Sequence, residues 1–149
     1  MIGDLKRWRI GAACGFALLG VLGSAAPAAM ARTLKATDMA HLRYVSASGS
    51  LLLEEGTATG TLPGKMRASV NVGATISGNF TFYLRGGTIK GHGEATPHGS
   101  GVYESFKGSV TVKGGTGRYA HAHGHTGLYG TFNRENYALV IQTTGTLSY

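Results

Sequence analysis

The stretch that decides the fold is KMRASVNVGATI, residues 65–76. Apolar side chains occupy every second position of this stretch: Met66, Ala68, Val70, Val72, Ala74 and Ile76. The first positions between them are polar: Lys65, Arg67, Ser69 and Asn71. A period of two residues is typical of a β-strand with one face in a core and the other in water. The stretch therefore predicts a strand in a sheet that has one wet face.

The same alternation recurs in NFTFYLR (79–85) and FKGSVTVK (106–113), and ENYALVIQTTGTLSY (135–149) is rich in aromatic and β-branched residues. Turn signals separate these runs, and the abundant glycine argues against helices. Counting between the turns predicts eight strands, near 40–49, 51–61, 65–74, 76–85, 88–95, 101–113, 117–132 and 136–149. Because closure removes exposed edges, we predict an all-β fold, an eight-stranded antiparallel barrel, with a two-sheet sandwich as the structural alternative.

Residues 1–31 have the features of a secretory signal peptide. The first nine residues contain three basic side chains, residues 10–22 are apolar and uncharged, and Ala29 and Ala31 provide small residues before a cleavage site. The apolar run is too short to span a bilayer comfortably. We therefore expect a secreted, extracytoplasmic protein with a single domain over residues 32–149.

The charge and cysteine content of residues 32–149 exclude several kinds of chemistry. This part of the chain has 11 Lys and Arg against 6 Asp and Glu, a net charge of +5, and no cysteine. Disulfides, thiolate metal sites and thiol catalysis are therefore excluded there. The basic residues are scattered singly, so no basic run predicts a nucleic-acid groove. We expect a solvated positive surface, no nucleic-acid partner, no membrane partner once the signal peptide is removed, and no cofactor.

The stretch GGTGRYAHAHGHTG (114–127) carries two chemical motifs. Gly115–Ala120 fits the dinucleotide fingerprint G-x-G-x-x-A, but that site needs a helix next, and the glycine-rich residues that follow argue against one. The alternating His121, His123 and His125 would share one face of a strand, and His92, His98 or Glu104 could add a ligand. A solvent-facing strand that tolerates histidine is the favoured interpretation. We therefore predict no metal site.

Other residues are candidates for a site inside the barrel. Glu104 is in phase with Phe106 and Val110 and would point inward, unless a bulge near Ser105 or Gly108 resets the phase. A buried carboxylate is a catalytic candidate, and His123 is the second one. Three aromatic residues are expected to line a ligand cavity: Phe80, Phe82 and Tyr119. A cavity that contains Glu104 or His123 would favour catalysis, and one without an ionisable group would favour binding.

FTFYLRGGTIKGHG (80–93) and YESFKGSVTVKGGTGRYAHAHG (103–124) resemble the barrel domain of plant allene oxide cyclases. GTATGTLPG (56–64), together with GGTGRYAHAHG, resembles the plant dirigent proteins, which share that barrel, and residues 32–149 are similar to small secreted bacterial proteins of the same superfamily. The resemblance implies a calycin-type barrel, often a trimer, with an apolar cavity. Its known activities are cyclising an epoxide fatty acid and steering the radical coupling of phenols.

The resemblance implies the fold more than the activity. Dirigent proteins carry Ala-Arg-Gly where this chain has Ala122-His123-Gly124, and the N-terminal carboxylate motif of the cyclases has no match. Two functional hypotheses follow. The first is a secreted barrel that binds a small apolar ligand or a partner. The alternative is a cyclase or isomerase that acts on an apolar substrate held in the cavity.

Overall fold

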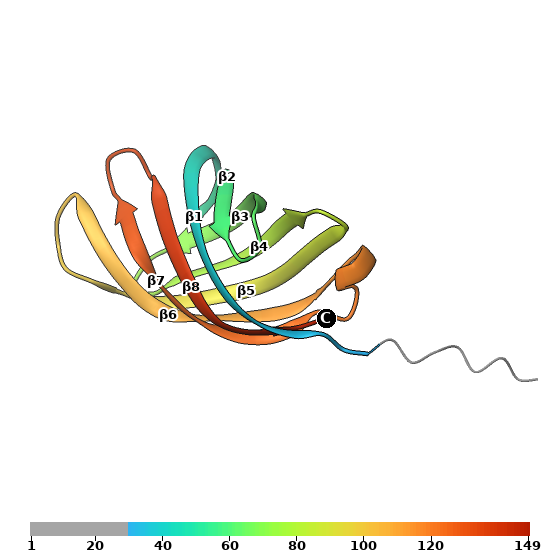
Figure 1. Cartoon of the computed structure of the whole chain (residues 1–149). Coiled ribbons are helices and arrows are strands. Elements are labelled where there is room, and N and C mark those ends of the chain that lie inside the picture. Colours follow the sequence, from blue (N-terminus) through green and yellow to red (C-terminus); the bar gives the residue numbers. More distant parts are fainter. Residues whose placement is uncertain (1–29) are drawn as a thin grey trace, which may run out of the picture.

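The computed structural model describes residues 30–149, so nearly all of the predicted signal peptide lies outside the described residues (Figure 1). The described chain forms one short 3-10 helix, η1 (Gly117–Tyr119), and eight strands. The strands are β1 (Thr33–Ser48), β2 (Leu51–Gly60), β3 (Gly64–Val72), β4 (Ile76–Leu84), β5 (Gly87–His98), β6 (Tyr103–Gly115), β7 (His123–Asn133) and β8 (Leu139–Ser148).

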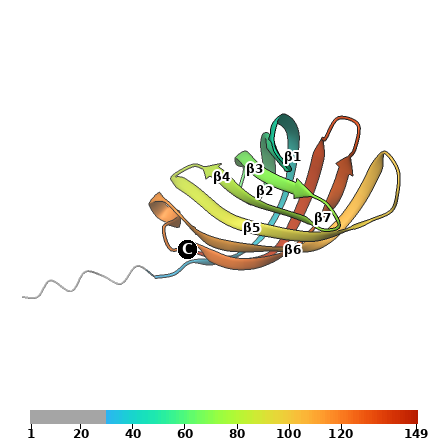
Figure 2. The ribbon, with the colours of Figure 1, turned by 180° about the vertical axis from the view of Figure 1, so that it is seen from behind.

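The strands form a closed antiparallel barrel, in which each strand pairs with the next and β8 pairs back with β1. The ladder between β1 and β8 runs from Thr33 opposite Ser148 to Leu42 opposite Leu139. Figure 1 shows these two strands side by side, and Figure 2 shows β3, β4, β5 and β6 along the opposite wall. The predicted all-β, eight-stranded antiparallel barrel is confirmed, and the two-sheet sandwich is excluded.

Two predicted strand boundaries are wrong. The first strand begins at Thr33 and not near residue 40, because its first half pairs with β8. The strand expected over 117–132 begins only at His123. Gly117, at a φ of 60°, starts a tight turn in which the Tyr119 N–H donates to the Thr116 carbonyl at 3.1 Å. The chain therefore makes the η1 turn across the end of the barrel before it enters β7.

Glycines on the inward face of the barrel allow neighbouring strands to approach each other closely. A Cβ atom on Gly108 would lie 1.9 Å from the carbonyl oxygen of Glu94, and one on Gly130 would lie 1.9 Å from that of Val140. No side chain fits at such a distance. Glycine at these positions lets neighbouring strands bend sharply around a small barrel.

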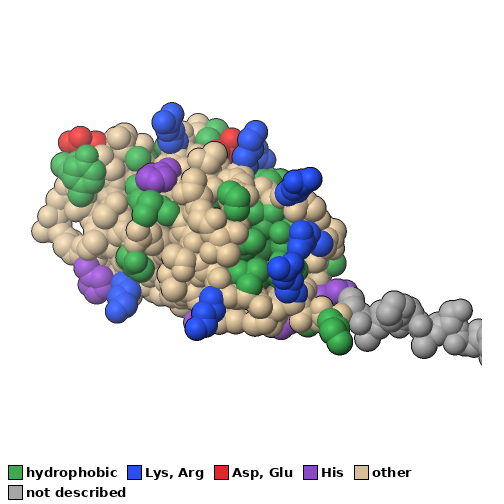
Figure 3. All heavy atoms as spheres, in the orientation of Figure 1, with side chains coloured by type: hydrophobic (Ala, Val, Ile, Leu, Met, Phe, Trp, Pro, Cys, Tyr) green, Lys and Arg blue, Asp and Glu red, His purple; other side chains and the backbone are tan. Residues whose placement is uncertain are grey.

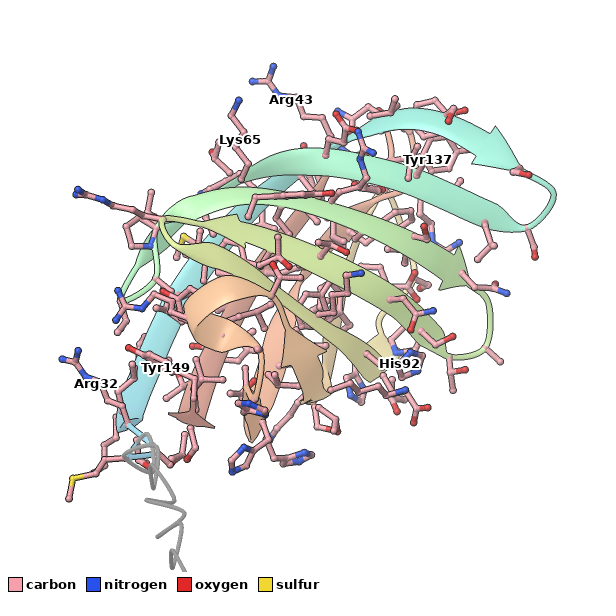
Figure 4. The ribbon with its side chains drawn as sticks, turned by 90° about the vertical axis from the view of Figure 1, so that its right-hand side faces the viewer. Arg32, Arg43, Lys65, His92, Tyr137 and Tyr149 are labelled. Carbon is pink, nitrogen blue, oxygen red and sulfur yellow. The ribbon has the colours of Figure 1, made fainter. Side chains whose placement is uncertain are left out.

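The two ends of the barrel differ, and they are named here the η1 end and the Tyr137 end. Odd-numbered strands begin and even-numbered strands end at the η1 end. Figure 3 shows a hydrophobic area, bordered by Lys and Arg side chains, on the right-hand side of the view, where η1 lies in Figure 1. Figure 4 places Arg32 and Tyr149 at the η1 end and Tyr137 away from it. At the Tyr137 end the ring of Tyr137 packs on Tyr44, with ring centres 5.4 Å apart, and on Phe132 at 6.0 Å.

Candidate functional site: an apolar cavity inside the barrel

The interior of the barrel contains a cavity of about 130 Å³. All eight strands contribute to its lining, which is almost entirely apolar. The strands β1, β2 and β3 contribute small side chains, among them Ala40, Ala58 and Ala68, and β4 and β6 contribute aromatic rings. Since the alanines leave unfilled volume beside the rings, the interior of this eight-stranded barrel is not completely packed.

Few polar side chains reach the cavity. The Thr126 hydroxyl is buried and has no hydrogen-bond partner in the part of the chain that the structure describes. Asp38 also lines the cavity, and its Oδ1 accepts the backbone N–H of Leu62 at 2.6 Å. Burial raises the pKa of Asp38, and the backbone N–H groups of Leu62 and Thr61 act in the opposite direction. Among the described residues, the buried Thr126 hydroxyl group is thus free to form a hydrogen bond with a ligand.

Of the three aromatic residues expected at a ligand cavity, Phe80 and Phe82 line this one. Tyr119 does not. It is buried on η1, where its ring packs on Tyr149 with ring centres 4.8 Å apart, and the Arg118 guanidinium lies 5.4 Å from the centre of the Tyr119 ring. Tyr119 therefore belongs to the packing of the η1 end and not to the cavity.

Neither catalytic candidate lies at the cavity. Glu104 is buried and points inward as its phase predicts, and the irregularity in the β5–β6 ladder falls at Lys90 and Gly91 instead. Its carboxylate forms an ion pair with Arg134 at the Tyr137 end. His123 is exposed at the start of β7, and its Nδ1 lies 2.9 Å from the carbonyl oxygen of His121.

The three histidines suggested for a metal are all exposed, and they do not form a continuous row on one strand. His121 lies in the turn before β7, and His123 and His125 lie on its outer face. His92, from β5, contacts Asn79 and Glu94 instead. Within residues 30–149, no three His, Cys, Asp or Glu side chains lie close enough together to hold a metal ion.

One buried carboxyl group was not among the site residues predicted from the sequence. Glu54 on β2 is fully buried, and neither of its carboxyl oxygens has a hydrogen-bond partner among the described residues. Burial raises the pKa of Glu54 to about 7. The position of Glu54 in its strand could have indicated this burial. Every second residue of this strand faces inward, and Glu54 shares that face with Leu52, Gly56 and Ala58. Its neighbour Glu55 faces outward and pairs with Arg67, as the alternation requires.

Comparison with known proteins adds no relative. No protein-family model, curated protein or solved structure matches the chain significantly. In the described part of the chain, no helix has both the length and the apolar character needed to cross a membrane. The function is therefore inferred from the geometry of the barrel.

Proposed function

We propose that this chain is a secreted barrel of the allene oxide cyclase and dirigent-like type that binds a small, mostly apolar molecule in its interior. The observation that carries the proposal is the apolar cavity of about 130 Å³. A cavity of about 150 Å³ lined by Leu, Ile and Phe stays dry and binds benzene. A molecule of the size of a single aromatic ring therefore suits this cavity, and burial of its apolar surface would drive binding.

The buried Thr126 hydroxyl refines the proposed ligand. A ring that carries one hydroxyl could exchange a hydrogen bond with it, whereas a plain hydrocarbon leaves it unpaired. A net hydrogen bond contributes about 1 kcal/mol, or roughly a factor of five in affinity. Phenol is therefore the preferred test ligand and benzene its apolar counterpart.

We expect wild-type protein to bind phenol saturably, and Ala68→Leu to abolish binding because the larger side chain fills the cavity. Thr126→Val should weaken phenol binding roughly fivefold and leave benzene binding unchanged. Titration calorimetry and chemical shift changes measure both effects. Ala47→Leu, at an exposed position of β1, is the matched control. Saturable binding that survives in folded Ala68→Leu would place the ligand elsewhere and contradict the proposal.

A cyclase or isomerase acting on the same ligand has less support. The two residues proposed for catalysis, Glu104 and His123, lie away from the cavity. Asp38 is the carboxylate that lines it, and one of its oxygens is already engaged by the Leu62 N–H. Binding without catalysis therefore agrees better with the lining.

The proposed secretion has its own test. Cleavage after Ala31 would leave Arg32 as the first residue, and Arg32 exchanges two backbone hydrogen bonds with Tyr149, at 2.7 and 2.9 Å. The barrel would thus begin at the mature terminus. Mass spectrometry of secreted protein should give an N-terminus near Arg32, and intact Met1 in membrane-free secreted protein would contradict this.

A further inference from the structure

Basic residues that are scattered in the sequence gather toward the η1 end of the barrel. They lie near the starts of odd-numbered strands, near the ends of even-numbered strands, or on η1: Lys35, Lys65, Arg85, Lys90, Lys113 and Arg118. Glu94, Glu104 and Glu135 lie toward the Tyr137 end, and Glu55 lies at the middle of β2, paired with Arg67. Asp38 is the carboxylate on the basic half, and it is partly buried. The barrel therefore has a positive half, which Figure 3 shows as the border of Lys and Arg around the hydrophobic area.

A groove of about 460 Å³ lies on the outer wall of this half, over β3, β4, β5 and β6. This volume is within the usual range for ligand sites, about 300–1,000 Å³. Figure 4 looks onto this wall, with Lys65 and His92 toward opposite corners. The groove is lined by polar and basic side chains: Arg67, Ser69, Asn79, Thr81, Lys90 and Lys113.

The floor of the groove is formed by backbone that carries no side chains. Gly91, Gly114 and Gly115 line it, beside the irregularity in the β5–β6 ladder. A Cβ atom on Gly91 would lie 2.6 Å from Cζ of Phe80, so the Phe80 ring lies directly beneath the wall at this point. The missing side chain of Gly91 therefore makes room for Phe80 on the inner side of the wall, and backbone atoms form part of the groove lining on the outer side.

The charges in this groove are largely uncompensated. Arg67 donates from Nε to Oε1 of Glu55 at 2.6 Å, but Lys90 and Lys113 take part in none of the ion pairs within residues 30–149. A ring N–H of His92 donates to Oδ1 of Asn79 at 2.9 Å, which leaves the Asn79 amide hydrogens available. The lining thus combines cationic donors with hydroxyl and amide groups, and it includes no carboxylate.

We propose that this groove binds an acidic polysaccharide. Carboxylate or sulfate groups would pair with Lys90 and Lys113, and the hydroxyl and amide groups suit sugar hydroxyls. An anionic lipid surface is less suitable, because surface binding to lipid needs apolar and basic side chains on the same face. The groove offers no such combination, because Phe80 is the one apolar residue in its lining and the Phe80 ring lies beneath the wall. The groove shares Asn79 and Phe80 with the cavity lining, but the two residues proposed to pair with the anion, Lys90 and Lys113, line the groove alone.

The test uses the chain from residue 32, which contains every strand of the closed barrel. Titration calorimetry with an oligogalacturonate should show binding that weakens as sodium chloride increases, since salt screens exposed charges. A neutral dextran oligosaccharide should not bind. The double variant Lys90→Gln, Lys113→Gln should bind oligogalacturonate at least about tenfold more weakly, the change expected when two charge-assisted contacts are lost.

The control is Lys35→Gln with Lys107→Gln, which removes the same charge from exposed positions outside the groove lining, one on β1 and one toward the Tyr137 end of β6. It should retain wild-type affinity within about twofold, as expected for surface charges distant from the site. Equal losses in both double variants would show attraction by net charge alone. Binding to phosphatidylglycerol vesicles without binding to oligogalacturonate would assign the surface to lipid. Either result, or no binding to oligogalacturonate, would overturn the proposal.

Discussion

Deletion of residues 137–149 is expected to leave the rest of the chain unfolded or insoluble. The segment contains β8, which pairs with β1 on one side and with β7 on the other. Without it, two long strand edges would present unpaired backbone groups. Leu139 and Leu147, each at most 3% exposed, would also be lost, one from each core cluster. Removing one buried leucine side chain costs about 2–5 kcal/mol, against a total stability of about 5–15 kcal/mol.

Circular dichroism and gel filtration of the truncated chain measure this effect. The control is a circular permutant that keeps every residue. A short linker would join Tyr149 to Arg32, whose backbones are already hydrogen bonded, and the new termini would lie at the exposed Gly99–Gly101 loop. The permutant should fold. A soluble truncated chain with its sheet content intact would show that the β1–β8 ladder is dispensable, and the closed barrel would not describe the protein in solution.

The sequence predicts the barrel well wherever inward side chains are large. The alternation in residues 65–76 appears as β3 and the start of β4. The first half of β1 was missed because its inward positions carry Ala36, Asp38 and Ala40, which give no hydrophobic period. At η1 the positive φ of Gly117 interrupts the extended chain. The strand that follows therefore cannot be located by continuing the alternation of the preceding strand.

The candidate site could be predicted only in part. Phe80 and Phe82 follow from strand phase, and both line the cavity. The cavity itself depends on alanines of β1, β2 and β3 lying beside aromatic rings of other strands, and such contacts exist only once the barrel closes. Likewise, the groove brings together Arg67, Lys90 and Lys113, which are distant in the chain. Single scattered basic residues give no pattern in a sequence, so this cluster is a property of the fold.

The wild-type protein is expected to lose stability as the pH rises from about 4.5 to 7, and replacing Glu54 with Gln is expected to remove this loss. The carboxyl group is fully buried and unpaired within the described residues, and burial raises its pKa from 4.5 to about 7. Transfer of an ionised carboxylate into such surroundings is costly, so the native state holds the proton. The unfolded chain has no such restriction.

The direction follows from the number of bound protons. Below pH 4.5 both states are protonated, and Glu54 causes no loss. Between pH 4.5 and 7 the unfolded chain releases the proton while the native barrel keeps it, so the free energy of unfolding falls as the pH rises. Above pH 7 both states are ionised and the loss is constant. A shift of this size amounts to about 3 kcal/mol, or roughly 10 °C in Tm for a domain of this length.

Urea unfolding of wild type and Glu54→Gln at several pH values between 4 and 8 measures the effect. The stability of the variant minus that of wild type should increase by about 3 kcal/mol across this range. Using the difference removes the contribution of Asp38, whose pKa is also raised but which is present in both proteins. Glu55→Gln is the matched control, since it alters an exposed ion pair with Arg67 and should keep the wild-type pH profile. Parallel profiles for Glu54→Gln and wild type would mean that Glu54 reaches water or a partner in solution, because only a carboxyl group without either holds its proton to neutral pH.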